Sequence, residues 1–223
     1  KGASAKALFG ETAMLAIACL SQKGGVGKST LSRLIATTYA KAGWSVKIAD
    51  FNTKQKTSVD WAAQRLDQAL APEIRAEAFS NVKLAMKDDV DLIVFDGKPD
   101  SEASTLEIAK SANLILLPCG VTTDDLMPQV KFAHELVSRG IRRSDILFVL
   151  NKTLDSAVAI QDARNFLLDA GYQTARTDLP ARTGYQMAQN SGRALTETPY
   201  SSLNDRAGEL AQEIVDQLTL VTT

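Results

Sequence analysis

The hydrophobic and polar positions of this chain fall into blocks of two kinds. Short runs that are almost wholly apolar have the length of buried strands, and they occupy residues 14–20, 45–50, 90–96, 113–117 and 145–150. Two weaker runs predict further strands at residues 73–79 and 172–177. Between the runs, apolar residues recur at helical spacing, over residues 31–39, 57–70, 101–111, 123–139, 156–170, 182–190 and 202–218, with a short helix at 81–87.

Strands and helices therefore alternate along the chain, which is typical of a parallel sheet covered by helices on both faces. We predict an α/β fold with a doubly wound, mostly parallel sheet. Two elements carry more specific expectations. The helix at 57–70 should turn Trp61, Leu66 and Leu70 toward the core. Pro118 should stop the strand at 113–117, because proline has no N–H group for the sheet ladder.

The length of 223 residues fits one domain of this class. Residues 1–13 show no periodicity, and we interpret them as a leader or flexible tail before a single domain over residues 14–223. The sequence contains no internal repeat, and no stretch reaches the roughly 18–20 apolar residues that a membrane span needs.

Composition and charge exclude some function classes. The chain is 45% hydrophobic and 23% charged, as ordinary globular proteins are, and its net charge of -1 argues against nucleic-acid binding through bulk positive charge. Cys19 and Cys119 lie in or at the end of apolar runs, so we expect buried thiols in a reducing cytoplasm rather than a disulfide. We expect no catalytic role for His134, the single histidine.

Residues 23–30 read Lys-Gly-Gly-Val-Gly-Lys-Ser-Thr and lie between an apolar strand and a helix. This is the pattern and the context of a phosphate-binding P-loop. Glycines let backbone N–H groups converge on a phosphate, and the helix start adds the positive end of its dipole. We predict that Lys28 reaches the phosphates of ATP and that Ser29 binds Mg²⁺. The loop residues predicted to bind nucleotide are Gly24, Gly25, Val26, Gly27, Lys28, Ser29 and Thr30.

Two aspartates, Asp50 and Asp96, each close an apolar strand. If both strands are parallel to the first, both carboxylates lie at the sheet edge that holds the P-loop. Carboxylates at this place hold Mg²⁺, usually through its water ligands. We therefore predict Ser29, Asp50 and Asp96 as the metal site of a P-loop nucleoside triphosphatase.

The motif has a second lysine, Lys23, which an ordinary P-loop does not need. In this it resembles the deviant Walker A motif of the ParA/MinD family, ATPases that position plasmids, chromosomes and other cargo. The resemblance implies a homodimer formed around ATP, in which Lys23 crosses the interface to the partner's nucleotide. It also implies cytoplasmic ATP hydrolysis with Lys23, Lys28, Asp50 and position 52 as catalytic groups, and a partner protein similar to ParB.

Position 52 departs from the family's pattern. The family's second strand usually ends Asp-x-Asp-Pro-Gln, whereas residues 50–55 here read Asp-Phe-Asn-Thr-Lys-Gln. The family's second aspartate orients the attacking water. The amide of Asn52 can hydrogen-bond a water but cannot accept its proton. We therefore expect nucleotide binding to survive and hydrolysis to be slower, by about 10²-fold.

A second departure follows Asp96. The family usually reads Asp-Thr-Pro-Pro there, and this chain reads Asp-Gly-Lys-Pro-Asp over residues 96–100. The loop senses the γ-phosphate in relatives. Lys98 adds a charge to it that either touches phosphate or is solvated, and we expect it to be solvated.

Weaker resemblances follow in the carboxyl half. Residues 149–152 look like the family's strand whose asparagine contacts adenine, which implies that Asn151 contacts the base. Residues 179–182 resemble the segment that closes over the base, which implies a contact from Pro180. The resemblance covers residues 14 to about 218, but only the P-loop is highly specific.

Three roles stay open from the sequence. The first and preferred one is a small partition protein that binds DNA nonspecifically in its ATP-bound form, which would place it at the nucleoid. Residues 128–193 contain nine Lys or Arg against six Asp or Glu, and Arg139, Arg142 and Arg143 cluster around a helix end. Such a cluster can contact phosphates, although arginines at the carboxyl end of a helix more often serve the helix dipole.

The second role is a MinD-like membrane positioner, which needs a basic amphipathic helix at the carboxyl end. The polar face of the helix at 202–218 is mostly acidic and would be repelled by anionic lipid, so we interpret it as a core helix and expect no membrane partner. The third role is a nucleotide-dependent binding switch with negligible turnover, acting in conjugation or in the positioning of protein clusters.

Overall fold

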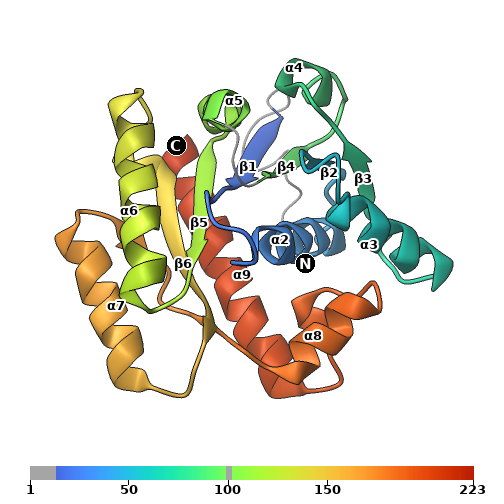
Figure 1. The fold of residues 1–223 in the computed structure, drawn as a ribbon. Helices are drawn as coiled ribbons and strands as arrows, with labels where there is room; N and C mark the ends of the chain where they lie inside the picture. The colour runs from blue at the N-terminus through green and yellow to red at the C-terminus, as the bar shows by residue number, and fades with distance from the viewer. Residues whose placement is uncertain (1–13, 99–101) are drawn as a thin grey trace.

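The computed structural model describes residues 14–98 and 102–223, so the predicted leader at 1–13 lies outside the described residues. Within them, eight strands form a sheet in the order β3-β2-β4-β1-β5-β6-β7, with β8 paired to β6, and every pair is parallel (Figure 1). The strands are β1 Leu15–Cys19, β2 Val46–Asp50, β3 Arg75–Ala78, β4 Leu92–Asp96, β5 Leu114–Cys119, β6 Ile146–Thr153, β7 Gln173–Thr174 and β8 Leu179–Pro180.

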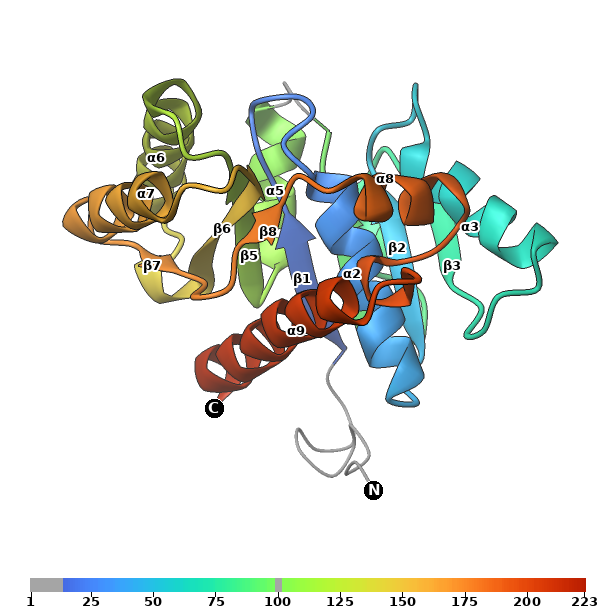
Figure 2. The same ribbon diagram turned by 90° about the horizontal axis from the view of Figure 1, so that it is seen from below.

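Helices cover both faces of this sheet. One face packs against α2, α3, α8 and α9, and the other against α4, α5, α6 and α7. Figure 2 shows α2, α8 and α9 together on one side. The helices are α2 Lys28–Lys41, α3 Thr57–Asp67, α4 Val82–Ala85, α5 Glu102–Ser111, α6 Thr123–Ser138, α7 Ala157–Asp169, α8 Thr183–Asn190 and α9 Ser201–Thr222.

The two cores follow from the alternation of side chains along each strand. In β1, Ile17 packs into the core beneath α2 and α9, whereas Ala16 and Ala18 face the core on the other side. Because both faces of each central strand are buried, these strands are nearly continuous apolar runs. The predicted doubly wound α/β fold is therefore confirmed, and the sheet is wholly parallel across the described pairs.

The prediction of which α3 residues face the core is partly wrong. Trp61 is buried as expected, but Leu66 is 57% exposed and Leu70 lies beyond the helix end at Asp67. Arg65 is buried in their place, with 1% of its side chain exposed. Periodicity in hydrophobicity cannot anticipate this arrangement, because the guanidinium is buried only through the carboxylate and carbonyl partners that the fold brings to it.

The expectation that Pro118 stops its strand is also wrong, because β5 continues to Cys119. The carbonyl oxygen of Leu116 accepts from Leu20 N on the β1 side, so Pro118, two residues later, faces that side too. There β1 has already ended at Cys19. The missing N–H group of proline therefore costs no ladder hydrogen bond.

Other expectations about the core are confirmed. Cys19 and Cys119 are free and buried, and burial raises the pKa of each thiol to about 12. The apolar face of α9, including Leu210 and Ile214, packs into the core as predicted. No helix in the described ranges is both long and apolar enough to cross a membrane.

Candidate functional site

The glycine-rich loop joins the end of β1 to the start of α2 at the carboxyl edge of the sheet (Figure 1). Gly25 and Gly27 have φ angles of 74° and 108°, in the left-handed region that favours glycine. A Cβ atom on Gly27 would lie 1.9 Å from the Nδ2 atom of Asn151. No side chain caps the amino end of α2, so its first turn presents the positive end of the helix dipole to an anion.

A cavity of about 310 Å³ lies over this helix start. All the predicted loop residues except Val26 line it, together with Asn52 from the loop after β2. Val26 instead accepts, through its carbonyl oxygen, a hydrogen bond of 2.6 Å from Asn151 Nδ2. The remaining lining residues are Arg33, Gln55, Thr57, Gly97 and Lys152. Lys98 is exposed, as its predicted solvation requires.

The two lysines of the loop have different surroundings. Lys28 is buried, and its Nζ donates to the carbonyl oxygen of Lys23 at 3.1 Å. Lys23 is half exposed, and its own Nζ lies 2.5 Å from Oδ1 of Asp125 in α6. Burial opposes ionisation of Asp125, but hydrogen bonds from Lys23 and Thr122 outweigh it and lower the pKa of this carboxyl group. In the single chain, Lys23 is thus held by its own α6.

The two predicted metal-binding aspartates are direct neighbours. Asp50 and Asp96 are paired in the register of β2 and β4, and their side chains are 0% and 2% exposed. Asp50 accepts from the backbone N–H groups of Asn52 and Ser58, each at 2.9 Å. Asp96 accepts from Ser58 Oγ at 2.6 Å. Ser58 therefore links the carboxylates, and Asp50 orders the loop between β2 and α3.

Asp96 has an unusual ionisation equilibrium. Its burial raises the pKa to about 6, hydrogen bonds from Ser58 and Ser29 oppose the rise, and the neighbouring charge of Asp50 adds to it. Arg33 opposes the rise only in part, so two carboxylates held side by side favour a cation between them and a ligand. A bound divalent cation would stabilise this pair of buried carboxylates, which repel one another in the unliganded chain.

Mg²⁺ also fits the chemistry of the donors here. Ser29, Asp50 and Asp96 offer only oxygen atoms, the donors that Mg²⁺ prefers. No group of three or more His, Cys, Asp or Glu side chains suited to a metal occurs in the described part of the chain. The ion would therefore complete its shell with water and phosphate oxygens rather than with further protein carboxylates, as Mg²⁺ usually does with nucleotides.

Asn52 lies at the rim of the cavity, with its side chain turned onto its own loop. Its Nδ2 donates to Gln55 Oε1 at 2.8 Å, and its Oδ1 accepts from Gln55 N at 3.3 Å. The amide thus bonds on both sides to one neighbour. This arrangement stabilises the loop but leaves the amide turned away from the role of orienting a water.

A second cavity of about 270 Å³ adjoins the first, and Thr30 and Lys152 line both. Asn151 and Pro180, predicted to contact the base, line this second cavity. Asn151 donates to the loop carbonyl of Val26, as described above. Lys152 Nζ likewise donates to Gly25 O at 2.6 Å, so the end of β6 supports the glycine-rich loop from below. The two cavities are therefore neighbours that share Thr30 and Lys152 in their walls.

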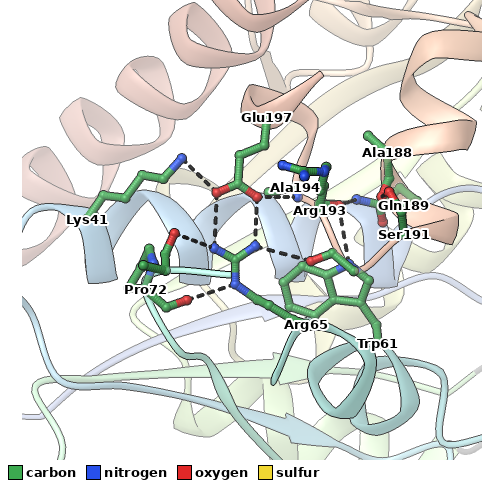
Figure 3. A network of polar contacts seen from close by, with 12 residues as sticks. Lys41, Trp61, Arg65, Pro72, Ala188, Gln189, Ser191, Arg193, Ala194 and Glu197 are labelled. Carbon is green, nitrogen blue, oxygen red and sulfur yellow. Dashed lines mark hydrogen bonds and ion pairs between the residues drawn. The ribbon is translucent and has the colours of Figure 1, made fainter. Parts of the chain in front are cut away.

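The segment that follows α8 is anchored to α3 by the buried arginine (Figure 3). Arg65 donates to both carboxylate oxygens of Glu197 at 2.7 and 3.0 Å and to the carbonyl oxygens of Pro72 and Gly192. Burial opposes ionisation of Glu197, but hydrogen bonds from Arg65, from the backbone N–H group of Ala194 and from Lys41 lower its pKa to about 2. The anchor fixes the wall of the second cavity to the helix that follows the loop of Asn52.

The arginine cluster proposed from the sequence for DNA contact has structural partners. Arg142 donates to Val221 O at 3.3 Å in the last turn of α9, and Arg143 donates to Ala170 O at 3.1 Å at the end of α7. Both serve the carboxyl ends of helices, the alternative that the sequence left open. The cluster precedes β6 and so lies at the edge of the sheet opposite the P-loop. Arg139 is exposed.

Several residues of the site were not predicted from the sequence. Thr57 and Ser58 begin α3 and bind Ser29 and both aspartates, and Asp125 holds Lys23. Arg33 could have been found from the sequence, because it lies four residues after Ser29 and therefore on the same face of α2. Hydroxyl groups at a helix start usually cap that helix, so nothing in the sequence distinguished Thr57 and Ser58.

A parallel sheet whose first strand leads through a glycine-rich loop into an uncapped helix, beside two buried carboxylates, defines a P-loop nucleotide-binding protein. The chain belongs to the CobQ/CobB/MinD/ParA nucleotide binding domain family, which residues 17–215 match. The family resemblance inferred from the double-lysine loop is therefore confirmed. Among curated proteins, none matches the sequence significantly.

Solved structures of this fold are similar over nearly the whole chain. The septum site-determining protein MinD from Pyrococcus horikoshii, complexed with Mg-ADP, has 16% identity and a TM-score of 0.71, with 95% of this chain and 99% of that chain covered. Apo McdA of Cyanothece has 15% identity, a TM-score of 0.69, and coverage of 91% and 100%. A Borrelia burgdorferi protein described as a plasmid partition protein, bound to AMPPNP, has 12% identity, a TM-score of 0.68, and coverage of 91% and 100%.

Proposed function

We propose that this chain binds ATP with Mg²⁺, forms a homodimer around the nucleotide and hydrolyses it slowly. The observation that carries the proposal is the pair of lysines in the P-loop. Lys28 lines the phosphate cavity, whereas Lys23 points away from it to Asp125, half exposed and available to a second chain. If two chains share the nucleotides between them, each chain needs a lysine that contacts the nucleotide of the other chain, and Lys23 is free of its own cavity for this role.

Each residue of the site has a defined task in this proposal. The amides of the glycine-rich loop and Lys28 bind the phosphates. Ser29 and Asp96 hold Mg²⁺, which when bound neutralises phosphate charge and orients the phosphates. Asp50 holds the loop after β2 in place and completes the negative charge around the metal. Asn151 and Pro180 border the space for the base.

The biological role that we propose is the partition or positioning of DNA in the cytoplasm, with nucleoid association in the ATP-bound form and a ParB-like adaptor as partner. Similarity in fold to McdA and to the Borrelia partition protein supports this role only at the level of fold. Among the arginines considered for DNA contact, Arg139 caps α6 through its backbone N–H group, but within the described residues its side chain makes no hydrogen bond to a helix end. DNA contact therefore rests on Arg139 and on surfaces created by dimerisation.

The test is nonspecific duplex DNA binding at a stated, moderate salt concentration, measured without nucleotide, with Mg-ADP and with Mg-ATP. Binding only with Mg-ATP, weakening steeply as salt rises, supports the partition role. If no nucleotide state binds DNA while Mg-ATP still produces a dimer, the DNA role is wrong and the cargo is a protein.

A second candidate is a nucleotide-dependent binding switch with negligible turnover. The two hydrogen bonds that turn Asn52 onto Gln55 favour it, because a side chain committed to its own loop contributes little to activating a water. Phosphate release under saturating Mg-ATP separates the two candidates. The alternative of a membrane positioner has no support in α9, whose apolar face is buried in the core.

A further inference from the structure

The amino end of α3 is held by two side chains of α2 that have different chemistry. Ser29 and Arg33, four residues apart, lie on the same face of α2. Ser29 Oγ lies 3.0 Å from the Thr57 hydroxyl oxygen, and Arg33 Nη2 donates to the Thr57 carbonyl oxygen at 2.6 Å. Thr57, the first residue of α3, is thus fixed to α2 twice.

The other arm of Arg33 reaches the segment on the far side of the site. Arg33 Nη1 donates to Gln189 Oε1 in α8 at 2.9 Å. Gln189 Nε2 in turn donates to the Arg193 carbonyl oxygen at 2.9 Å, which also accepts from the indole of Trp61 (Figure 3). The Arg33 guanidinium lies over the Trp61 ring, 5.5 Å from its centroid. Arg33 therefore joins the wall of the phosphate cavity to the wall of the second cavity.

The two links to Thr57 would respond differently to a bound metal. The Ser29 hydroxyl is the predicted Mg²⁺ ligand, so its bond to Thr57 would weaken with the ion bound. The bond from Arg33 involves no metal ligand and would stay. The next residue, Ser58, carries the hydrogen bonds to both aspartates. The contacts from α2 that hold Thr57 therefore also keep the two carboxylates in the arrangement that the metal requires.

The charge of Arg33 favours the ionised forms of Asp96 and Asp50, but its shape suits it to hold α3 and α8. The two hydrogen-bond acceptors of the guanidinium are neutral, a carbonyl and an amide oxygen. Its third donor, Nε, is buried and has no hydrogen-bond partner within the described residues. A lysine would keep the charge at this position, but its single ammonium group could not span Thr57 and Gln189 with the same geometry.

We propose that Arg33 is a positioning residue, which keeps α3 and α8 fixed against α2 while Ser29 changes its partner from Thr57 to Mg²⁺. This inference rests on the proposed binding of Mg-ATP. It makes Arg33 important for the part of the nucleotide affinity that depends on the metal. Affinity in the absence of metal, which comes from Lys28 and the loop amides, should not depend on it.

The experiment measures ATP affinity calorimetrically for the full chain and its variants, once with Mg²⁺ and once with EDTA. We expect Arg33→Gln and Arg33→Lys to weaken binding about tenfold with Mg²⁺, the effect of losing a charge-assisted hydrogen bond, and less than about twofold with EDTA. Gln189→Ala removes only the second arm and should weaken Mg²⁺-dependent binding about threefold. Arg193→Gln is the matched control, because it removes the same charge from an exposed side chain and leaves the backbone bonds in place.

A spectroscopic readout accompanies the affinities. The chain has two tryptophans, so Trp44→Phe leaves Trp61, which lies under Arg33, as the only indole. In that background, Mg-ATP should change Trp61 emission little while Arg33 is present. In both Arg33 variants, Mg-ATP should shift the emission, because α3 then moves against α2.

Three results would overturn the inference. If Arg33→Lys binds as the unsubstituted chain does while Arg33→Gln loses affinity with and without Mg²⁺, the charge acts on the phosphates and positioning is wrong. If both variants lose affinity equally in the two conditions, the role is general stability. Unchanged affinities in both variants remove any role. Absence of Mg-ATP binding by the unsubstituted chain would instead overturn the proposed function, and this inference with it.

Discussion

Lys23 and Asp125 form an ion pair within one chain, although 102 residues separate them in the sequence. The pair joins the front of the P-loop to the first turn of α6. Lys23 must leave Asp125 before it can contact a nucleotide bound to another chain. In the proposed dimer, the ion pair therefore competes with dimerisation, and its strength sets how much the nucleotide must contribute to release the lysine.

The first prediction concerns this competition. Removing the acceptor with Asp125→Asn should strengthen Mg-ATP-dependent dimerisation by up to about fivefold, because an exposed ion pair contributes little to stability. Removing the lysine with Lys23→Gln should abolish the dimer while leaving the ATP affinity of the single chain nearly unchanged. Sedimentation velocity measures the first quantity, and calorimetry measures the second.

Asp124→Asn is the control for this prediction. Asp124 is an exposed neighbour on the same helix turn, so its substitution removes the same charge without removing the acceptor of Lys23. Equal effects of the two substitutions would mean that net charge, not the ion pair, governs dimerisation. A normal dimer formed by Lys23→Gln would contradict the proposed role of Lys23.

The second prediction is that the two neighbouring aspartates have opposite effects on stability. The pKa of Asp96 is raised from 3.8 to about 6, so ionisation destabilises the unliganded fold in full above about pH 6, and this cost is lost as pH falls from 6 toward 3.8. Asp96→Asn should therefore raise the free energy of unfolding at pH 7.5, by about 1–3 kcal/mol. Asp50→Asn should lower it by a similar amount, because an amide cannot accept both backbone N–H bonds that Asp50 accepts.

Urea unfolding of the unliganded chain measures both changes. The same two variants should lose the gain in stability that Mg-ATP gives over ATP with EDTA. Two changes of the same sign in the unliganded chain would show that our account of the carboxylate pair is wrong. A full Mg²⁺ response in Asp96→Asn would remove Asp96 from the metal site.

The third prediction tests position 52. Asn52→Asp should raise the rate of phosphate release by about 10²-fold, the usual contribution of a general base. The new carboxylate can still accept from Gln55 N, so the loop should stay folded, but it loses the donation to the Gln55 side chain and becomes free to turn toward the cavity. Asn52→Ala is the control, and it should hydrolyse no faster than the original chain. If Asn52→Asp releases phosphate no faster than the original chain, Asn52 is not the cause of the slow turnover that we expect.

The fourth prediction concerns the anchor between α3 and the segment after α8. The pKa of Glu197 is lowered to about 2 from 4.5, so its contribution to stability is complete above about pH 4.5 and is lost as pH falls toward 2. After allowance for solvent screening, this contribution is about 1–2 kcal/mol. Glu197→Gln should remove that part of the acid dependence. At neutral pH it should destabilise the chain by about 3 kcal/mol, because Arg65 stays buried without its countercharge.

Unfolding followed between pH 2.5 and pH 7 measures this dependence. Glu209→Gln, an exposed substitution on α9, is the control and should change neither the slope nor the neutral stability by more than about 0.5 kcal/mol. An acid slope that Glu197→Gln leaves unchanged would assign the acid sensitivity to other carboxyl groups.

The sequence was sufficient for the parts of the molecule that local patterns determine. The alternation of apolar runs and helical periodicity predicted the sheet and its covering helices, and the double-lysine loop predicted the family. Local sequence patterns could not predict the interactions between distant segments. The burial of Arg65 depends on Glu197, which lies 132 residues away. The continuation of β5 through Pro118 depends on where β1 ends.

The same limit applies to the site. Asp50 and Asp96 could be placed at one edge because parallel strands end together. The hydroxyl groups of Thr57 and Ser58, which connect these carboxylates to Ser29, look like ordinary helix-start residues in the sequence. Only the fold brings the start of α3 onto α2 and shows that Arg33 and Ser29 share one target.

The central claim is that Mg-ATP joins two copies of this chain, and sedimentation velocity in three nucleotide conditions tests it most directly. The account predicts a single chain without nucleotide and with Mg-ADP, and a dimer with Mg-ATP that is lost when EDTA is added. A single chain in all three conditions, with ATP bound, would contradict the shared-nucleotide account. A dimer that forms equally without nucleotide would contradict it as well, because the ion pair between Lys23 and Asp125 would then have no part in assembly.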